Sequence, residues 1–125
     1  MTLNDKQLET KSKIESLSSI INIDPVWAVS IAMVESSLGL FQKSHTSCRG
    51  VFQMSSIAMK DLLLEMENID DDLVDLLCGM LFLRLLLQRH GSIEKATSHF
   101  CDPDDRSFYI NKVFDYMKEF SNERG

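Results

Sequence analysis

Glu35 is the residue whose type and setting most clearly point to chemistry. On a helix it shares one face with Ala28, Ile31 and Ala32, which precede it by seven, four and three residues. Taking a carboxylate out of water on such an apolar face disfavours its charged form and raises its pKa. A carboxyl that keeps its proton near neutral pH can serve as a general acid. A glutamate in the last turn of a helix can also bend out to water, so position alone leaves both interpretations open.

The cysteines give little indication of chemistry. Cys48, Cys78 and Cys101 form no CxxC pair and cannot all be bridged to one another. Cys78 stands within an apolar run and is predicted to be a small buried hydrophobic residue. We expect neither a metal ion nor a cofactor.

Composition predicts one all-α domain that spans residues 1–125. A chain of 125 residues with 44% hydrophobic and 26% charged residues is typical of a single soluble globular domain. Its 5 glycines and 2 prolines leave little material for the tight turns of a β fold. The formal net charge of −6 argues against a nucleic-acid partner, which would require a basic surface.

Neither an export signal nor a membrane span is predicted. The first twenty residues lack the basic start and the continuous apolar stretch of a signal peptide. The most apolar segment, residues 73–87, contains Asp75 and Arg84, so it is too short and too charged to cross a bilayer.

The helix that carries Glu35 has the clearest start in the chain. Asp24 is a good N-cap, and Pro25 suits the first helical position because its missing N–H would be unpaired there anyway. The apolar run that follows predicts a buried central helix with Trp27 inside, ending near Ser36 with Gly39 as its stop.

Other helices must hold this one in place. We predict five to seven helices in all, with little or no sheet. We expect them over residues 4–21, about 55–67, 70–90, 92–100 and from about 106 to the end. The first begins with a capping box formed by Asn4 and Gln7. Its apolar residues at helical spacing are Leu8, Ile14, Leu17 and Ile21, and those that mark the last helix are Phe108, Ile110, Val113, Phe114, Met117 and Phe120.

Residues 23–55 resemble the soluble lytic transglycosylase family, whose fold is similar to that of goose-type lysozyme. Members have an apolar helix that ends in Glu-Ser, then a loop, then a Gly-Leu-Met-Gln turn. Here the helix ends in Glu35-Ser36, and the turn is the sequence GVFQ that ends at Gln53, at the family's usual spacing. Weaker likenesses extend over about residues 10–120, at Gly79, Phe82, Leu83, Arg89-His90-Gly91 and Tyr109 to Val113.

The resemblance implies a lysozyme-like helical domain that cleaves peptidoglycan. Glu35 would be the sole catalytic carboxyl, acting first as acid and then as base at the bond between N-acetylmuramic acid and N-acetylglucosamine. Ser36 and Gln53 would line the cleft beside it, with Gln53 hydrogen-bonded to the sugar. The implied partner is the glycan strand.

The chain departs from the family at one motif. Members usually have Ala-Tyr-Asn-Ala-Gly where this chain has the sequence SHFCD of residues 98–102. Phe100 therefore replaces the tyrosine whose hydroxyl contacts the acid, and Cys101 replaces the asparagine. Phe100 and Tyr109 are expected to line the substrate site, with Tyr109 as the candidate to take over the missing contact. His99 is a weaker polar neighbour and is expected on the surface.

Two alternatives accompany a lytic transglycosylase. A lysozyme-type hydrolase would need a second carboxylate to activate water, for which Asp102, Asp104 and Asp105 are the candidates. A catalytically impaired domain would bind glycan or serve as a structural part of a larger assembly. Because no export signal is predicted, the resemblance suits a phage lysin that is held in the cytoplasm before release or carried in a virion. A secretion-system factor is the other alternative.

Overall fold

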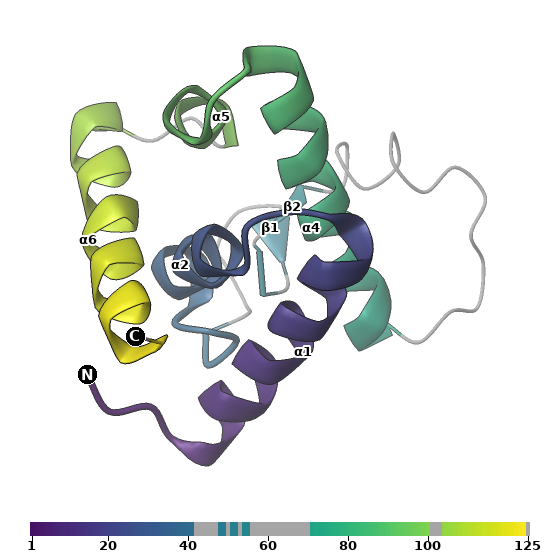
Figure 1. Cartoon of the computed structure of the whole chain (residues 1–125). Helices are drawn as coiled ribbons and strands as arrows, with labels where there is room; N and C mark the ends of the chain where they lie inside the picture. Colours follow the sequence, from purple (N-terminus) through teal and green to yellow (C-terminus); the bar gives the residue numbers. More distant parts are fainter. Residues whose placement is uncertain (42–47, 50, 53, 56–70, 101–103, 125) are drawn as a thin grey trace.

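The computed structural model describes residues 1–41, 48, 49, 51, 52, 54, 55, 71–100 and 104–124. Within these residues the protein is helical apart from two strands of two residues each, which confirms the predicted all-α class (Figure 1). The helices are α1 (Asp5–Ile21), α2 (Pro25–Ser36), α4 (Asp71–His90), α5 (Ile93–Phe100) and α6 (Arg106–Arg124). The helix predicted over residues 55–67 lies almost wholly outside the described part.

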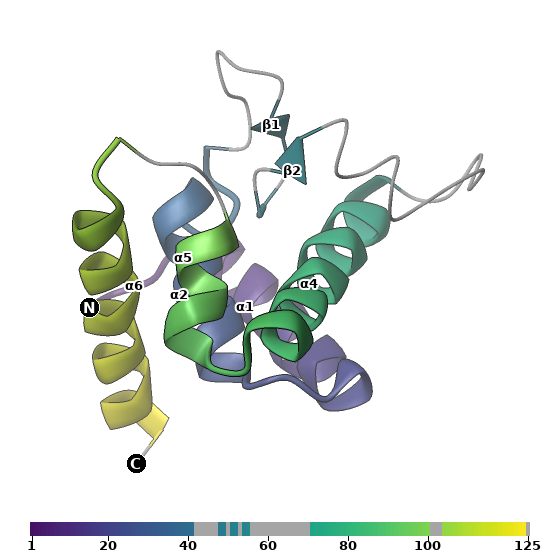
Figure 2. The same cartoon turned by 90° about the horizontal axis from the view of Figure 1, so that it is seen from above.

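The two short strands form the remaining regular element. Strands β1 (Cys48–Arg49) and β2 (Met54–Ser55) pair antiparallel, with Cys48 opposite Ser55 and Arg49 opposite Met54. Figure 2 shows this pair beyond the end of α2 and near α4.

Helix α2 is the central element, as predicted, and α6 and α1 both pack against it (Figures 1 and 2). Asp24 caps its start by accepting hydrogen bonds from the backbone N–H groups of Val26 and Trp27. Trp27 is fully buried, and its indole Nε1–H donates to Thr97 Oγ1 of α5 over 2.9 Å. This hydrogen bond satisfies the polar end of the largest side chain in the core.

Helix α1 begins with the predicted capping box. Asn4 Oδ1 accepts from the Gln7 backbone, and Gln7 Oε1 accepts from the Asn4 backbone. Ile14 and Ile21 face the core, whereas Leu8, which was grouped with them, is 49% exposed. The carbonyls of Ile21 and Asn22 at the end of α1 accept hydrogen bonds from the Arg84 guanidinium. A cation at a helix C-terminus is favourable, which accounts for a charge within the apolar α4.

Helix α4 ends as predicted at His90, with Gly91 in the left-handed region (φ 82°). Cys78 is buried in it, as expected. Among the described residues no helix is both long enough and apolar enough to cross a membrane.

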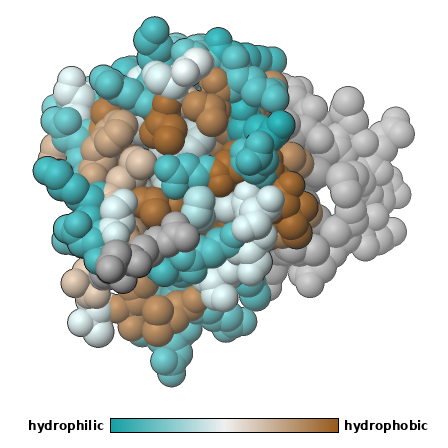
Figure 3. All heavy atoms as spheres, in the orientation of Figure 1, coloured by the Kyte–Doolittle hydropathy of each residue, from teal (hydrophilic) through white to brown (hydrophobic). Residues whose placement is uncertain are grey.

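The prediction for α6 was right at Val113 and Phe120, wrong at Phe108 and Phe114, and did not include Tyr109. Phe108 is 64% exposed and Phe114 is exposed as well, whereas Tyr109, Val113 and Phe120 are buried. The buried residues face α2 and α5, against which α6 packs. Figure 3 shows apolar side chains interspersed with polar ones on one face of the molecule.

Candidate active site

Glu35 lies in the last turn of α2 and is half-buried. Its Oε2 accepts a hydrogen bond of 2.7 Å from the Tyr109 hydroxyl, which comes from the first turn of α6. Tyr109 is 7% exposed, so its ring packs in the core while its hydroxyl reaches the carboxyl. The two residues are 74 positions apart in the chain, and the packing of α6 on α2 brings them together.

Burial and hydrogen bonding act on the Glu35 carboxyl in opposite directions. Burial raises its pKa above the ordinary value of 4.5, and the Tyr109 hydrogen bond lowers it by a smaller amount. The net effect is a raised pKa, the direction predicted from the apolar face that Glu35 shares with Ala28, Ile31 and Ala32, all fully buried.

This arrangement can hold and move one proton. The protonated carboxyl is an acid for a leaving group, and the carboxylate that remains keeps the Tyr109 hydroxyl as a donor. A donor fixed on Oε2 also restricts how the carboxyl turns, which leaves Oε1 as the oxygen available for proton transfer.

Ser36 is buried beside Glu35, and its hydroxyl is used within the protein. It donates to the carbonyl oxygen of Val51, while its oxygen accepts from the N–H of Gly39 over 2.9 Å. Ser36 therefore ties the end of α2 to the turn between β1 and β2. Its predicted contact with a sugar stays a prediction.

The turn that Ser36 holds includes Phe52, which is fully buried against α4. A Cβ atom built on Gly79 would lie 2.4 Å from Cγ of Phe52, so only glycine lets this ring approach the helix so closely. Gln53, the predicted sugar ligand, follows Phe52 directly but lies outside the described residues.

Phe100, predicted to line the substrate site, is 7% exposed. Its ring packs against Phe82 of α4 with 5.6 Å between ring centroids. The described contact is thus with the core, and contact with substrate stays a prediction. Beside it His99 is exposed, as expected, and stacks on His90 with 3.9 Å between centroids.

The aspartates proposed for a hydrolase differ in setting. Asp104 and Asp105 are exposed, and Asp105 Oδ1 accepts from the Phe108 backbone N–H at the start of α6 over 2.9 Å. The Asp105 carboxylate is therefore occupied as a helix cap. Asp102 lies outside the described residues.

Helix α2 ends at Ser36 as predicted, but the sequence did not indicate the backbone conformation of the turn that follows. Ser37, Leu38 and Gly39 all have positive φ, at 51°, 56° and 90°. The Ser37 carbonyl oxygen accepts a hydrogen bond of 3.1 Å from Gln7 Nε2 of α1. The capping box had identified Gln7, but nothing in its local sequence indicates a partner thirty residues away.

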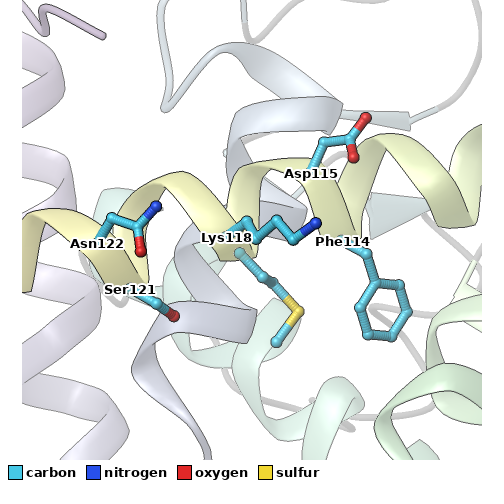
Figure 4. Close-up of a pocket in the computed structure, with 6 residues that line it drawn as sticks. Phe114, Asp115, Lys118, Ser121 and Asn122 are labelled. Carbon is cyan, nitrogen blue, oxygen red and sulfur yellow. The ribbon is translucent and has the colours of Figure 1, made fainter.

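A pocket of about 330 Å³ lies against α6 (Figure 4). Its lining residues are Phe114, Asp115, Met117, Lys118, Ser121 and Asn122. Because neither Glu35 nor Tyr109 lines it, the pocket adds nothing to the chemistry of the carboxyl.

The chain matches no protein family model, no curated protein and no solved structure.

Proposed function

We propose that this protein is a lytic transglycosylase that cleaves the β-1,4 bond between N-acetylmuramic acid and N-acetylglucosamine in bacterial peptidoglycan. The observation that carries the proposal is the Glu35 carboxyl at the end of α2, with a raised pKa and a 2.7 Å hydrogen bond from Tyr109. The resemblance of the Glu35-Ser36 and Gly-x-x-Gln segments to that family supports the choice of substrate.

Glu35 would act twice in the reaction. Its proton passes to the glycosidic oxygen as the bond to the muramic acid C1 breaks, and the N-acetylglucosamine hydroxyl departs. The C6 hydroxyl of the same muramic acid then forms a bond to C1, and its proton passes to the Glu35 carboxylate. The products are a new hydroxyl end and a 1,6-anhydro end, and Glu35 regains its proton.

A single carboxyl suffices for this route, since the nucleophile belongs to the substrate. A hydrolase would need a second carboxylate to activate water. Asp105 caps α6, and Asp104 lies in the exposed segment just before that helix, so neither is held rigidly against a water molecule. These features favour the transglycosylase over the hydrolase.

The Glu35→Gln variant tests the proposal. The amide keeps the shape of the side chain and an acceptor for Tyr109 but has no acidic proton. We expect clearance of purified cell walls to fall at least about a hundredfold, the lower range for loss of general acid catalysis. Glu119→Gln, at an exposed position of α6, is the matched control and should clear walls like the wild type. Full activity in Glu35→Gln would place the acid elsewhere.

The products separate the two enzymes. A transglycosylase yields muropeptides lighter by one water molecule than those of a hydrolase, with no new reducing ends after borohydride treatment. If the main products carry reducing ends, the hydrolase is correct, and asparagine substitutions at Asp102, Asp104 and Asp105 should identify its base.

A further inference from the structure

The turn directly after Glu35 has a backbone conformation that its side chains disfavour. Ser37 and Leu38 both occupy the left-handed region, where the Cβ atom crowds the following carbonyl. Two such residues in a row, one of them the bulky Leu38, need support from the surrounding structure. Leu38 is fully buried, so the core holds its side chain.

The backbone of this turn is held from two sides. Within the turn, the Ser36 hydroxyl oxygen accepts from the Gly39 N–H. From α1, Gln7 Nε2 donates to the Ser37 carbonyl oxygen over 3.1 Å. Gln7 is itself 7% exposed and fixed through Oε1 by the Asn4 backbone N–H, so its amide is a rigid support.

We infer that Gln7 is a positioning residue for Glu35: by anchoring the strained turn at Ser37, it keeps the last turn of α2 wound and the Glu35 carboxyl against the Tyr109 hydroxyl. Without this anchor, the backbone of Ser37 lowers its free energy by leaving the left-handed region. The end of α2 then loosens, because the backbone N–H groups of Ser37 and Leu38 donate to the carbonyls of Met33 and Ala32 in that last turn. Glu35 lies within the same turn and becomes more hydrated.

The test is the titration of Glu35, followed by NMR of its ¹³C-labelled carboxyl in the free protein. Gln7→Met keeps a side chain of similar length and removes the donor. We expect the Glu35 pKa to move down from its raised position toward 4.5, the ordinary value, because hydration favours the charged form. A purely structural role would lower stability and leave this pKa unchanged.

Two further variants make the test specific. Asn4→Ala breaks the same capping box but leaves Gln7 Nε2 on Ser37, so its Glu35 should titrate like the wild type. Ser37→Gly added to Gln7→Met removes the strain, since glycine adopts this conformation freely, and should restore the wild-type titration. If Gln7→Met does not fold, Gln7→Glu, which keeps the capping acceptor, replaces it, with the new carboxyl assigned separately.

An unchanged Glu35 pKa in Gln7→Met, or an equal shift in Asn4→Ala, would overturn the inference. Its catalytic consequence rests on the proposed function: the alkaline limb of the pH–rate profile should move to lower pH with the pKa. The titration itself needs no substrate. A wild-type protein that fails to clear cell walls would refute the proposed function and leave the positioning result standing.

Discussion

At the residue scale, Tyr109 supplies a hydroxyl to Glu35 that the resemblance assigns to a different position. In that resemblance the family's tyrosine would correspond to Phe100, which packs on Phe82 inside the core. The contact with the acid comes instead from α6, over 2.7 Å. The carboxyl therefore has a phenolic donor although Phe100 has no hydroxyl.

Tyr109→Phe should lower the rate of wall cleavage by about one to two orders of magnitude, the worth of a hydrogen bond to a charged group. Removing the donor destabilises the carboxylate, so the Glu35 pKa should rise further. Tyr116→Phe, on the same helix two turns later, is the control and should change neither quantity. Equal rates for the two variants would mean that the Tyr109 hydroxyl has no part in the reaction.

At the element scale, the β1–β2 turn is held against both α2 and α4. Ser36 bonds the Val51 carbonyl from α2, and Phe52 packs against Gly79 of α4. These two contacts hold the adjacent residues Val51 and Phe52. A displacement of Phe52 should therefore also move the Ser36–Val51 hydrogen bond beside Glu35.

Gly79→Ala should destabilise the protein by about 1–3 kcal/mol, because the new methyl group would lie 2.4 Å from the Phe52 ring. It should also lower activity, since Phe52 must move. Gly91→Ala is the matched control: its φ of 82° costs about 1 kcal/mol for alanine, but no atom lies within 4 Å of the new Cβ. Chemical denaturation and wall clearance should show stability losses in both variants and an activity loss in Gly79→Ala alone.

At the scale of the whole molecule, two groups make stability depend on pH in opposite senses. The folded pKa of Glu35 is raised, so its contribution is fully present below 4.5 and is lost as pH rises through the folded value. The folded pKa of His90 is lowered by loss of hydration and then by the charges of His99, Arg89 and Lys95. Its contribution is present above 6.5 and is lost as pH falls through the folded value.

Glu35→Gln should therefore raise the thermal unfolding midpoint at pH values above the folded pKa of Glu35, where the wild type holds a charged, half-buried carboxylate, and change it little at about pH 4. His90→Gln should show the reverse pattern, with a gain at about pH 5 and little change at about pH 8. Scanning calorimetry across this range measures both. A difference between the Glu35→Gln and wild-type midpoints that does not grow with pH would contradict the raised pKa.

The helix starts and several helix ends could be predicted from the sequence alone. Asn4 with Gln7, Asp24 with Pro25, and Gly91 act through bonds or backbone angles within a few residues, so the local sequence contains the whole interaction. The burial of Trp27 was equally predictable, since a helix that is apolar nearly all round has no face for water.

Tertiary structure decided which aromatic residues at the start of α6 are buried and which residues meet at Glu35. Val113 and Phe120 of the buried face of α6 could be predicted, but the exposure of Phe108 and the burial of Tyr109 could not. The partners of Glu35 and Ser37 lie far away in the chain, at Tyr109 and Gln7. Such contacts depend on the angle and register at which helices pack, which are set by side-chain fit over the whole core and not by any local pattern.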